Sequence, residues 1–266
     1  MSDNQRLAVI TGASAGLGAV FASRLAARGY DLLLAARRRQ RLEELKREIE
    51  AGSKTAVSIA EADLSEPAAL EEFAADLERR ERVDLLVNNA GFGTVGYFWE
   101  TDYQKQEQMH RLHIGATMRL TRAVLGGMVT RGSGAIINVA SVAGFLRSAG
   151  NTSYCATKGW MCDFTEGLRL ELDSVKSPVV VQALCPGFTY TEFHDVMGVD
   201  RSRIGKSWWM PAGFVVDESL KALQTGQVFV IPGWRYKVLV AIASRLPAAW
   251  RMRMERRSAP RRGAAR

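Results

Sequence analysis

Seven short apolar runs recur along the chain, separated by longer segments whose apolar side chains have helical spacing. The runs lie at residues 7–10, 31–35, 55–60, 83–88, 135–140, 179–184 and 227–231. Several are apolar at every position, as is typical of parallel strands that are buried on both faces. Helices are expected over 38–51, 66–80, 101–128 and 152–174, with another from Pro211. This alternation predicts an α/β fold with a doubly wound parallel sheet of about seven strands and helices on both faces.

The net charge of +8 is unevenly distributed along the 266 residues. From Trp234 to the end there are ten Lys or Arg and one Glu, so the net charge of residues 1–233 is about −1. A nearly neutral body argues against nucleic-acid binding. No linker-like stretch interrupts residues 1–233, which predicts a single domain there, followed by an apolar and then basic tail over 234–266.

Cysteine usage and the N-terminus favour a cytoplasmic protein. Cys155, Cys162 and Cys185 are odd in number and lack paired spacing, so no disulfide framework is expected. The start, MSDNQRLAVITG, enters a strand almost at once and leaves no room for a signal peptide. No apolar run reaches the ~18–20 residues needed to span a bilayer. No Cys, His and Asp cluster has the spacing of a metal site.

The first apolar run leads into TGASAGLG, which contains Gly12, Gly16 and Gly18. Gly12 can take a positive φ in the turn, Gly16 lets the backbone approach a pyrophosphate, and Gly18 lets the helix pack closely. The helix that follows Ser14 and Leu17 offers free N–H groups and the positive end of its dipole to phosphates. A plain tight turn is the alternative. A strand before the loop and a helix after it favour a dinucleotide site of the Rossmann type.

The end of the second run, LLLAARRR, indicates which dinucleotide would bind. An acid about 20 residues after the glycine loop would bind a ribose 2′-hydroxyl, whereas an Arg would accommodate a 2′-phosphate. Ala36 stands where the acid would be, and Arg37 and Arg38 follow it. Guanidinium groups match phosphate, so NADP(H) is favoured over NAD(H). The alternative is a solvated helix start, although basic residues in a first turn oppose the helix dipole.

Two further segments end strands at the same edge of the predicted sheet. Asp63 follows the third run and could receive the adenine amino group, or serve only as a turn or cap residue. The sequence NNAG follows the fourth run and includes Asn89, Ala90 and Gly91. These residues could place backbone against the adenine ribose or form a plain turn.

Ser141, Tyr154 and Lys158 form the candidate catalytic set. Tyr154 and Lys158 are four residues apart on one face of a predicted helix, and Ser141 ends the fifth run. A carbonyl that accepts a hydride must also receive a proton, which a Tyr can donate. We expect Lys158 to lower the pKa of Tyr154 from ~10 and to hold the nicotinamide ribose. Ser141 is expected to hydrogen-bond the substrate oxygen.

The stretches TGASAGLG, NNAG, SVAGF, YCATK and PGFTYT together resemble the short-chain dehydrogenase/reductase family in its compact single-domain form. They occur in family order and spacing over residues 6 to about 192. The resemblance implies that Pro186 and Gly187 lead the chain over the nicotinamide, with Thr189 and Thr191 placed to bind its carboxamide. It also implies a homodimer or homotetramer built on the helices at 101–128 and 152–174.

One position departs from the family pattern. Family members usually carry an Asn before strand five that holds a proton-relay water beside the Lys, and His113 stands there in QMHRLHIGATMRLT. His113 could preserve the helix distortion and the water, or act as a titrating group in an altered relay. The alternative is a helix histidine with satisfied hydrogen bonds.

Residues 188–210 are irregular and are expected to form a lid over the substrate. Aromatic and Met side chains there and in other loops suggest an apolar pocket; they are Phe92, Tyr97, Phe145, Phe188, Phe193, Met197, Trp208 and Trp209. The alternative is that they are core or dimer contacts. The tail joins a short apolar stretch to basic groups and tryptophans. It could lie on an anionic membrane surface or pack as a C-terminal helix with a frayed arginine end.

Together these features predict an NADP(H)-dependent oxidoreductase that transfers a hydride between nicotinamide and a small-molecule carbonyl or secondary alcohol. A bulky, lipid-like substrate is the hypothesis. One alternative is an epimerase or dehydratase of the extended type, which would need a longer C-terminal substrate domain. The other is a catalytically silent NADP-binding module or membrane-attached sensor, against which the intact Ser, Tyr and Lys set argues.

Overall fold

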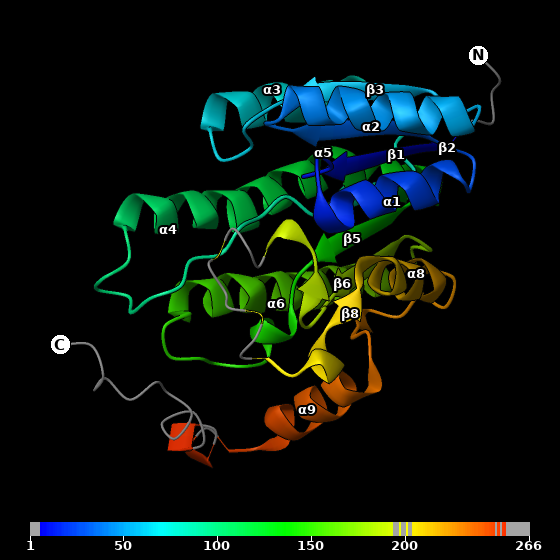
Figure 1. Ribbon diagram of the computed structural model, residues 1–266. Coiled ribbons are helices and arrows are strands. Elements are labelled where there is room, and N and C mark those ends of the chain that lie inside the picture. Colours follow the sequence, from blue (N-terminus) through cyan, green and yellow to red (C-terminus); the bar gives the residue numbers. More distant parts are fainter. Residues whose placement is uncertain are drawn as a thin grey trace.

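A seven-stranded parallel sheet forms the centre of the molecule in a computed structural model that describes residues 6–193, 197, 201, 204–247, 249–250 and 252–253. The strand order is β3-β2-β1-β4-β5-β6-β9 (Figure 1). The strands are β1 (Arg6–Thr11), β2 (Tyr30–Ala36), β3 (Val57–Glu61), β4 (Leu85–Asn88), β5 (Ala135–Val139), β6 (Val180–Leu184) and β9 (Phe229–Val230). Each neighbouring pair is parallel, so the predicted doubly wound sheet is confirmed.

Helices cover both faces of this sheet. One face carries α1 (Gly16–Ala26), α2 (Arg39–Gly52), α8 (Ala212–Leu223) and α9 (Trp234–Arg245), and the other carries α3 (Pro67–Arg79), α5 (Thr117–Arg131) and α6 (Thr152–Ser174). Consecutive strand residues pack into opposite cores, with Ile10 on the first face and Val9 on the second. This two-sided burial explains why the strands read as continuous apolar runs.

The segment predicted as one helix over 101–128 consists of three pieces. They are α4 (Tyr103–His110), a π-helical turn η1 (Arg111–Ala116) and α5. Helix α4 begins two residues later than predicted. Asp102 caps its N-terminus, because the carboxylate accepts hydrogen bonds from the backbone N–H groups of Gln104 and Lys105. The π-helical turn carries His113 into the interior, where its side chain is fully buried. Such turns often mark functional sites.

The chain after β6 forms a second, two-stranded sheet. Its strands are β7 (Thr189–Tyr190) and β8 (Met210–Pro211), and a 3-10 turn, η4 (Lys206–Trp208), precedes β8. The segment predicted as a lid over 188–210 therefore begins at β7 and ends at β8, two strands that pair with each other. Residues 194–196, 198–200 and 202–203 of this segment lie outside the described residues.

Helix α9 gives the start of the tail a defined place. Tyr236, Val240 and Ala243 on its inner side are buried. Figure 1 shows α9 at the bottom of the molecule, at the opposite end from α2 and α3. The tail thus contains a packed helix over 234–245, whereas its last arginines lie outside the described residues. None of the described helices is both long and apolar enough to cross a membrane.

Candidate active site

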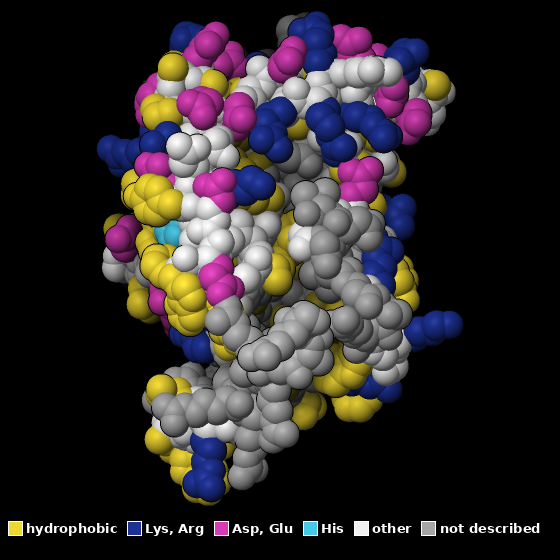
Figure 2. Space-filling view, turned by 60° about the vertical axis from the view of Figure 1, so that its left-hand side comes forward, with side chains coloured by type: hydrophobic (Ala, Val, Ile, Leu, Met, Phe, Trp, Pro, Cys, Tyr) yellow, Lys and Arg dark blue, Asp and Glu magenta, His cyan; other side chains and the backbone are white. Residues whose placement is uncertain are grey.

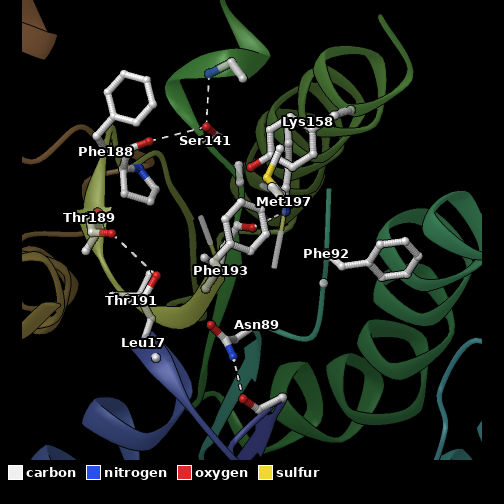
Figure 3. A pocket seen from close by; sticks show the side chains of 18 of the residues that line it. Leu17, Asn89, Phe92, Ser141, Lys158, Phe188, Thr189, Thr191, Phe193 and Met197 are labelled. Carbon is white, nitrogen blue, oxygen red and sulfur yellow. Dashed lines mark hydrogen bonds between the residues drawn. The ribbon is translucent and has the colours of Figure 1, made fainter. Parts of the chain in front are cut away.

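A cavity of about 1010 Å³ lies at the carboxyl ends of the central strands (Figure 3). Most residues singled out in the sequence line it: Gly12, Ser14, Gly16, Leu17, Arg37, Arg38, Asp63, Asn89, Ala90, Gly91, Ser141, Tyr154, Lys158, Pro186, Gly187, Thr189 and Thr191. Gly18 and His113 are not in its wall. The topology therefore brings together residues that are up to 179 positions apart, from Gly12 to Thr191.

The glycine loop forms the floor of the cavity at the start of α1. Gly12 has φ +65°, as predicted, and Gly16 has φ +57°, so both turns need glycine. A side chain at Gly18 would meet the Asn89 amide at 2.6 Å and the Ala13 Cα at 2.9 Å. The three glycines therefore leave a bare backbone cradle in front of the N-terminal end of a helix.

The turn after β4 is tied to this loop. The Asn89 amide donates to the carbonyl oxygens of Thr11 (2.8 Å) and Gly12 (3.1 Å). The Thr11 hydroxyl accepts from the backbone N–H groups of Asn89 and Ala90, both at 3.0 Å. Asn89 thus holds two cavity-lining turns at a fixed separation, and Figure 3 shows it beside the loop.

The arginines after β2 are all compensated by carboxylates. Arg37 pairs with Asp63 at 3.5 Å and Arg38 with Glu192 at 3.1 Å, and Arg38 also donates to the Ser14 hydroxyl. Arg37 and Arg38 are 67% and 48% exposed, so these pairs are weak and exchangeable. An anion such as a phosphate can therefore compete for both guanidinium groups.

Asp63 is a turn residue in the structure. Its carboxylate accepts from the backbone N–H of Ser65 at 3.0 Å and from the Ser65 hydroxyl at 2.6 Å. Burial raises the pKa of Asp63, but these hydrogen bonds and Arg37 outweigh it and leave the pKa lowered. The carboxylate also lines the cavity, so the turn role does not prevent contact with a ligand.

The hydroxyl of Tyr154 and the ammonium of Lys158 sit in a buried part of the cavity. Lys158 Nζ donates to the Val139 carbonyl oxygen at 2.7 Å and lies 5.8 Å from the Tyr154 ring centroid. Burial raises the pKa of Tyr154, opposed by a hydrogen bond with Ser141. The expectation that Lys158 lowers this pKa is therefore wrong for the protein alone, because desolvation dominates and the ammonium is engaged by a strand carbonyl. Burial also lowers the pKa of Lys158 to about 8.

His113 connects the π-helical turn to the catalytic helix. Its Nδ1 lies 2.9 Å from the Thr157 hydroxyl, and that hydroxyl donates to the Tyr154 carbonyl oxygen at 2.9 Å. A hydroxyl has one proton, so Nδ1 is the donor in this pair and Nε2 carries the lone pair. Nε2 is buried and has no hydrogen-bond partner among the described residues, and a side chain at Gly91 would meet it at 2.6 Å. Burial, with Lys158 and His110, holds the pKa of His113 well below its usual range.

Five of the eight apolar residues expected around the substrate line the cavity: Phe92, Phe188, Phe193, Met197 and Trp208. Figure 3 shows Phe193 and Met197 reaching into its middle, near Lys158 and Asn89. The Phe193 ring centroid lies 5.9 Å from that of Tyr154.

The other three residues expected there pack elsewhere. The Trp209 ring stacks on Tyr190, Tyr97 stacks on Trp99, and Phe145 packs edge-on against Phe229. The expectation of a shared pocket is wrong for these three, because each side chain already has an aromatic partner outside the cavity wall.

Sequence reasoning did not place Tyr236 and Leu239 of α9 in the site, yet both line the cavity. The Tyr236 hydroxyl accepts from the Phe188 backbone N–H at 2.9 Å and donates to the Trp208 carbonyl oxygen at 2.7 Å. Its ring covers Gly187 so closely that no side chain would fit there. The helical spacing of Tyr236, Val240 and Ala243 was the available signal that this tail helix packs inward.

A family model described as short chain dehydrogenase matches residues 6–201. The chain belongs to the short-chain dehydrogenase family. This short-chain dehydrogenase is 36% identical over 193 residues to the NADP-dependent 3-hydroxy acid dehydrogenase YdfG of Escherichia coli K12, covering 71% of this chain and 75% of that protein. It is 34% identical over 187 residues to an uncharacterised oxidoreductase of Staphylococcus saprophyticus, covering 70% and 79%.

Solved structures of this family have the same fold over nearly the whole chain. A short-chain dehydrogenase from Sphingobium yanoikuyae in complex with NADPH has a TM-score of 0.82 and 33% identity, with 98% of each chain covered. The bulky-bulky ketone specific alcohol dehydrogenase from Comamonas testosteroni has a TM-score of 0.78 and 28% identity, also with 98% of each covered. This short-chain dehydrogenase is thus an oxidoreductase with a nicotinamide-nucleotide site and acts on CH–OH or ketone groups.

Proposed function

We propose that the protein is an NADP(H)-dependent reductase of bulky apolar ketones, or a dehydrogenase of the matching secondary alcohols, with Ser141, Tyr154 and Lys158 as catalytic residues. The observation that carries this proposal is the convergence of these three groups at one end of a cavity with apolar walls. Each of the three is buried, so a substrate that fills the cavity would react in a site largely enclosed by protein.

The cavity fits a nicotinamide dinucleotide phosphate. The Cβ-free cradle of Gly12, Gly16 and Gly18 leaves room for a pyrophosphate against the start of α1. The end of β2 has Ala36 in place of a carboxylate, and Arg37 and Arg38 follow at the cavity wall. These guanidinium groups are suited to a 2′-phosphate. The NADPH complex of the Sphingobium relative and the NADP-dependent YdfG support this preference.

The catalytic step requires a hydride, which the reduced nicotinamide supplies when bound. Tyr154 donates its hydroxyl proton to the carbonyl oxygen as the carbonyl carbon accepts that hydride. Its raised pKa keeps the proton in place at neutral pH until charge develops on the substrate oxygen. Ser141 orients this oxygen by donating a hydrogen bond. The Lys158 ammonium would bind the ribose hydroxyls of the nicotinamide nucleotide and so orient the hydride donor. Solvent then returns a proton to Tyr154.

An apolar substrate is favoured by the charges around the cavity. Among the lining residues that the structure describes, the cationic side chains are Arg37, Arg38 and Lys158. The first two lie at the adenosine end, beside Asp63, and Lys158 is held by a strand carbonyl. A substrate carboxylate near Ser141 would therefore lack a guanidinium partner among the described residues that line the cavity. This argues for a bulky ketone rather than the 3-hydroxy acid of YdfG.

A panel of ketones tests the substrate proposal. NADPH oxidation would be followed with 2-alkanones of increasing chain length, beside NADP⁺ reduction with 3-hydroxy acids. Each added methylene that becomes buried contributes about 0.8 kcal/mol, so kcat/KM should rise about fourfold per methylene until the cavity is filled. A flat series, or a preference for the hydroxy acids, would contradict the apolar substrate.

Self-association is the remaining part of the proposal. Met118 on α5 and Leu170 on α6 are 51% and 66% exposed, which suits a helical interface. Light scattering should give two or four times the chain mass, and Leu170→Glu should lower it. A wild-type monomer at micromolar concentration would contradict this.

A further inference from the structure

Helix α9 has apolar side chains on two opposite sides. Its inner side carries Tyr236, Val240 and Ala243, and Tyr236 belongs to the cavity wall. Its outer side carries Trp234, Val238 and Ile242, which are 70%, 50% and 53% exposed. These three follow one another at intervals of four residues and so form one stripe along the helix. A surface helix that packs only against a core would be polar on that outer side.

Basic residues flank this outer stripe. Arg235 and Lys237 are exposed at its start, and Arg245 is exposed in the last turn of the helix. Trp250 and Met252, just beyond α9, are 65% and 56% exposed. Figure 2 shows hydrophobic and basic side chains together on the lowest part of the molecule, where Figure 1 places the C-terminal segment.

Charge decides which partner suits this stripe. Residues 234–266 carry ten Lys or Arg and one Glu. A second copy of the chain seated there would bring the same positive charge against the first. The net charge of residues 1–233 is only about −1, so the rest of the second copy would not compensate it. An anionic lipid surface has the opposite charge and accepts tryptophan and aliphatic side chains at its boundary. The twelve residues of α9 are too few to span a bilayer, so the helix would lie flat on it.

The other exposed aromatic patch of the described chain differs from this stripe. Phe98, Trp99 and Tyr103, in the loop before α4 and its first residue, are 59%, 74% and 71% exposed. Glu100 and Asp102 lie among them, so this loop lacks positive charge. Of these two described patches, the outer side of α9 is the one that combines apolar exposure with a basic surround.

We propose that the outer side of α9 binds the surface of an anionic phospholipid bilayer. Binding there would hold the wall of the catalytic cavity, to which Tyr236 and Leu239 of the same helix belong, next to the lipid phase. The functional benefit rests on the proposed apolar substrate, which would partition into that phase. The binding itself does not depend on the chemistry of the site.

Vesicle co-sedimentation tests the proposal with the full-length protein. Phosphatidylcholine vesicles with and without phosphatidylserine would be compared for wild type, Val238→Glu and the matched control Val175→Glu. Val175 is an exposed valine at the end of α6, 64% accessible. We expect wild type and Val175→Glu to bind the anionic vesicles, more weakly at high salt, and Val238→Glu to partition about tenfold less.

Two outcomes would overturn the proposal. One is a wild type that does not bind the anionic vesicles. The other is a Val238→Glu variant that binds them as well as Val175→Glu does; a fall in the mass of that variant in solution would then identify the face as an interface between copies. NADPH oxidation with a short, water-soluble ketone should be equal in all three proteins. That assay separates failure of membrane binding from failure of the reductase function.

Discussion

At the scale of single residues, burial shifts the pKa values of three side chains so that the neutral form of each is favoured. The pKa of Tyr154 is raised, and those of Lys158 and His113 are lowered. For Tyr154 this shift preserves the proton that a reduction needs. For Lys158 it brings loss of the ammonium into the working range of pH, because the pKa is about 8 instead of 10.5. For His113 it removes the charge altogether near neutrality.

The rate of ketone reduction should therefore depend on Lys158 at alkaline pH. The ammonium is present below about pH 8 and lost above it, whereas Tyr154 keeps its proton. We expect kcat/KM with NADPH to be level below pH 8 and to fall above it. Lys237→Met, which changes an exposed lysine, should leave this profile unchanged. A profile that stays level to pH 10 would contradict the role of Lys158.

His113 should act by positioning and not by titration. Thr157→Val removes the acceptor of the buried His113 Nδ1–H, which should destabilise the fold by about 1–3 kcal/mol. Denaturant unfolding would measure this, with Thr130→Val as the control at an exposed threonine. The pH profile of kcat/KM should show no limb near 6.5. A limb there that disappears in His113→Asn would show that His113 titrates during turnover.

At the scale of elements, the junction of β2 and α2 sets the cofactor preference. Arg37→Ala and Arg38→Ala should each lower kcat/KM with NADPH by about 10–100-fold, because each removes a charged hydrogen-bond donor to phosphate. The values with NADH should change little. Arg24→Ala, which breaks an exposed ion pair between α1 and Asp217 of α8, is the matched control. Equal losses with NADPH and NADH would show that these arginines do not read the 2′-phosphate.

Helix α9 is the second element with a specific consequence for the site. Tyr236→Phe leaves the Phe188 N–H and the Trp208 carbonyl without their partner, which should cost about 1–3 kcal/mol and raise KM for bulky ketones severalfold. Tyr30→Phe is a matched control, since the Tyr30 hydroxyl accepts only from an exposed arginine at 3.4 Å among the contacts described. Unchanged unfolding and KM in Tyr236→Phe would remove α9 from the working site.

The elements differ in how far the sequence predicts them. α6 begins and ends where its pattern indicates, since Tyr154, Cys155, Lys158 and other inward residues keep one helical period. The segment over 101–128 does not form the single helix that its pattern indicates. A π-helical turn adds a residue there without disturbing the apolar pattern on either side. Hydrogen bonds such as Lys158 to Val139 and His113 to Thr157 join distant segments, and only the packed fold determines them.

At the scale of the whole molecule, the positions of the site residues follow from topology. Parallel strands whose carboxyl ends meet at one edge bring the glycine loop, the Asn89 turn, Ser141 and Pro186 to one cavity. Motif spacing was sufficient to predict this gathering. It could not predict that α9 returns to cover Gly187, because the packing partner of a tail depends on surfaces that exist only after the sheet has formed.

The most direct test of the account is Tyr154→Phe, measured in two ways on the same protein. NADPH binding, followed by cofactor fluorescence, should be close to wild type, because the cradle and the arginines are intact. The kcat/KM for NADPH-dependent reduction of a ketone that the wild type accepts should fall by about 10²–10⁴-fold, because the proton donor is gone. Equal rates for Tyr154→Phe and wild type would contradict the proposed mechanism.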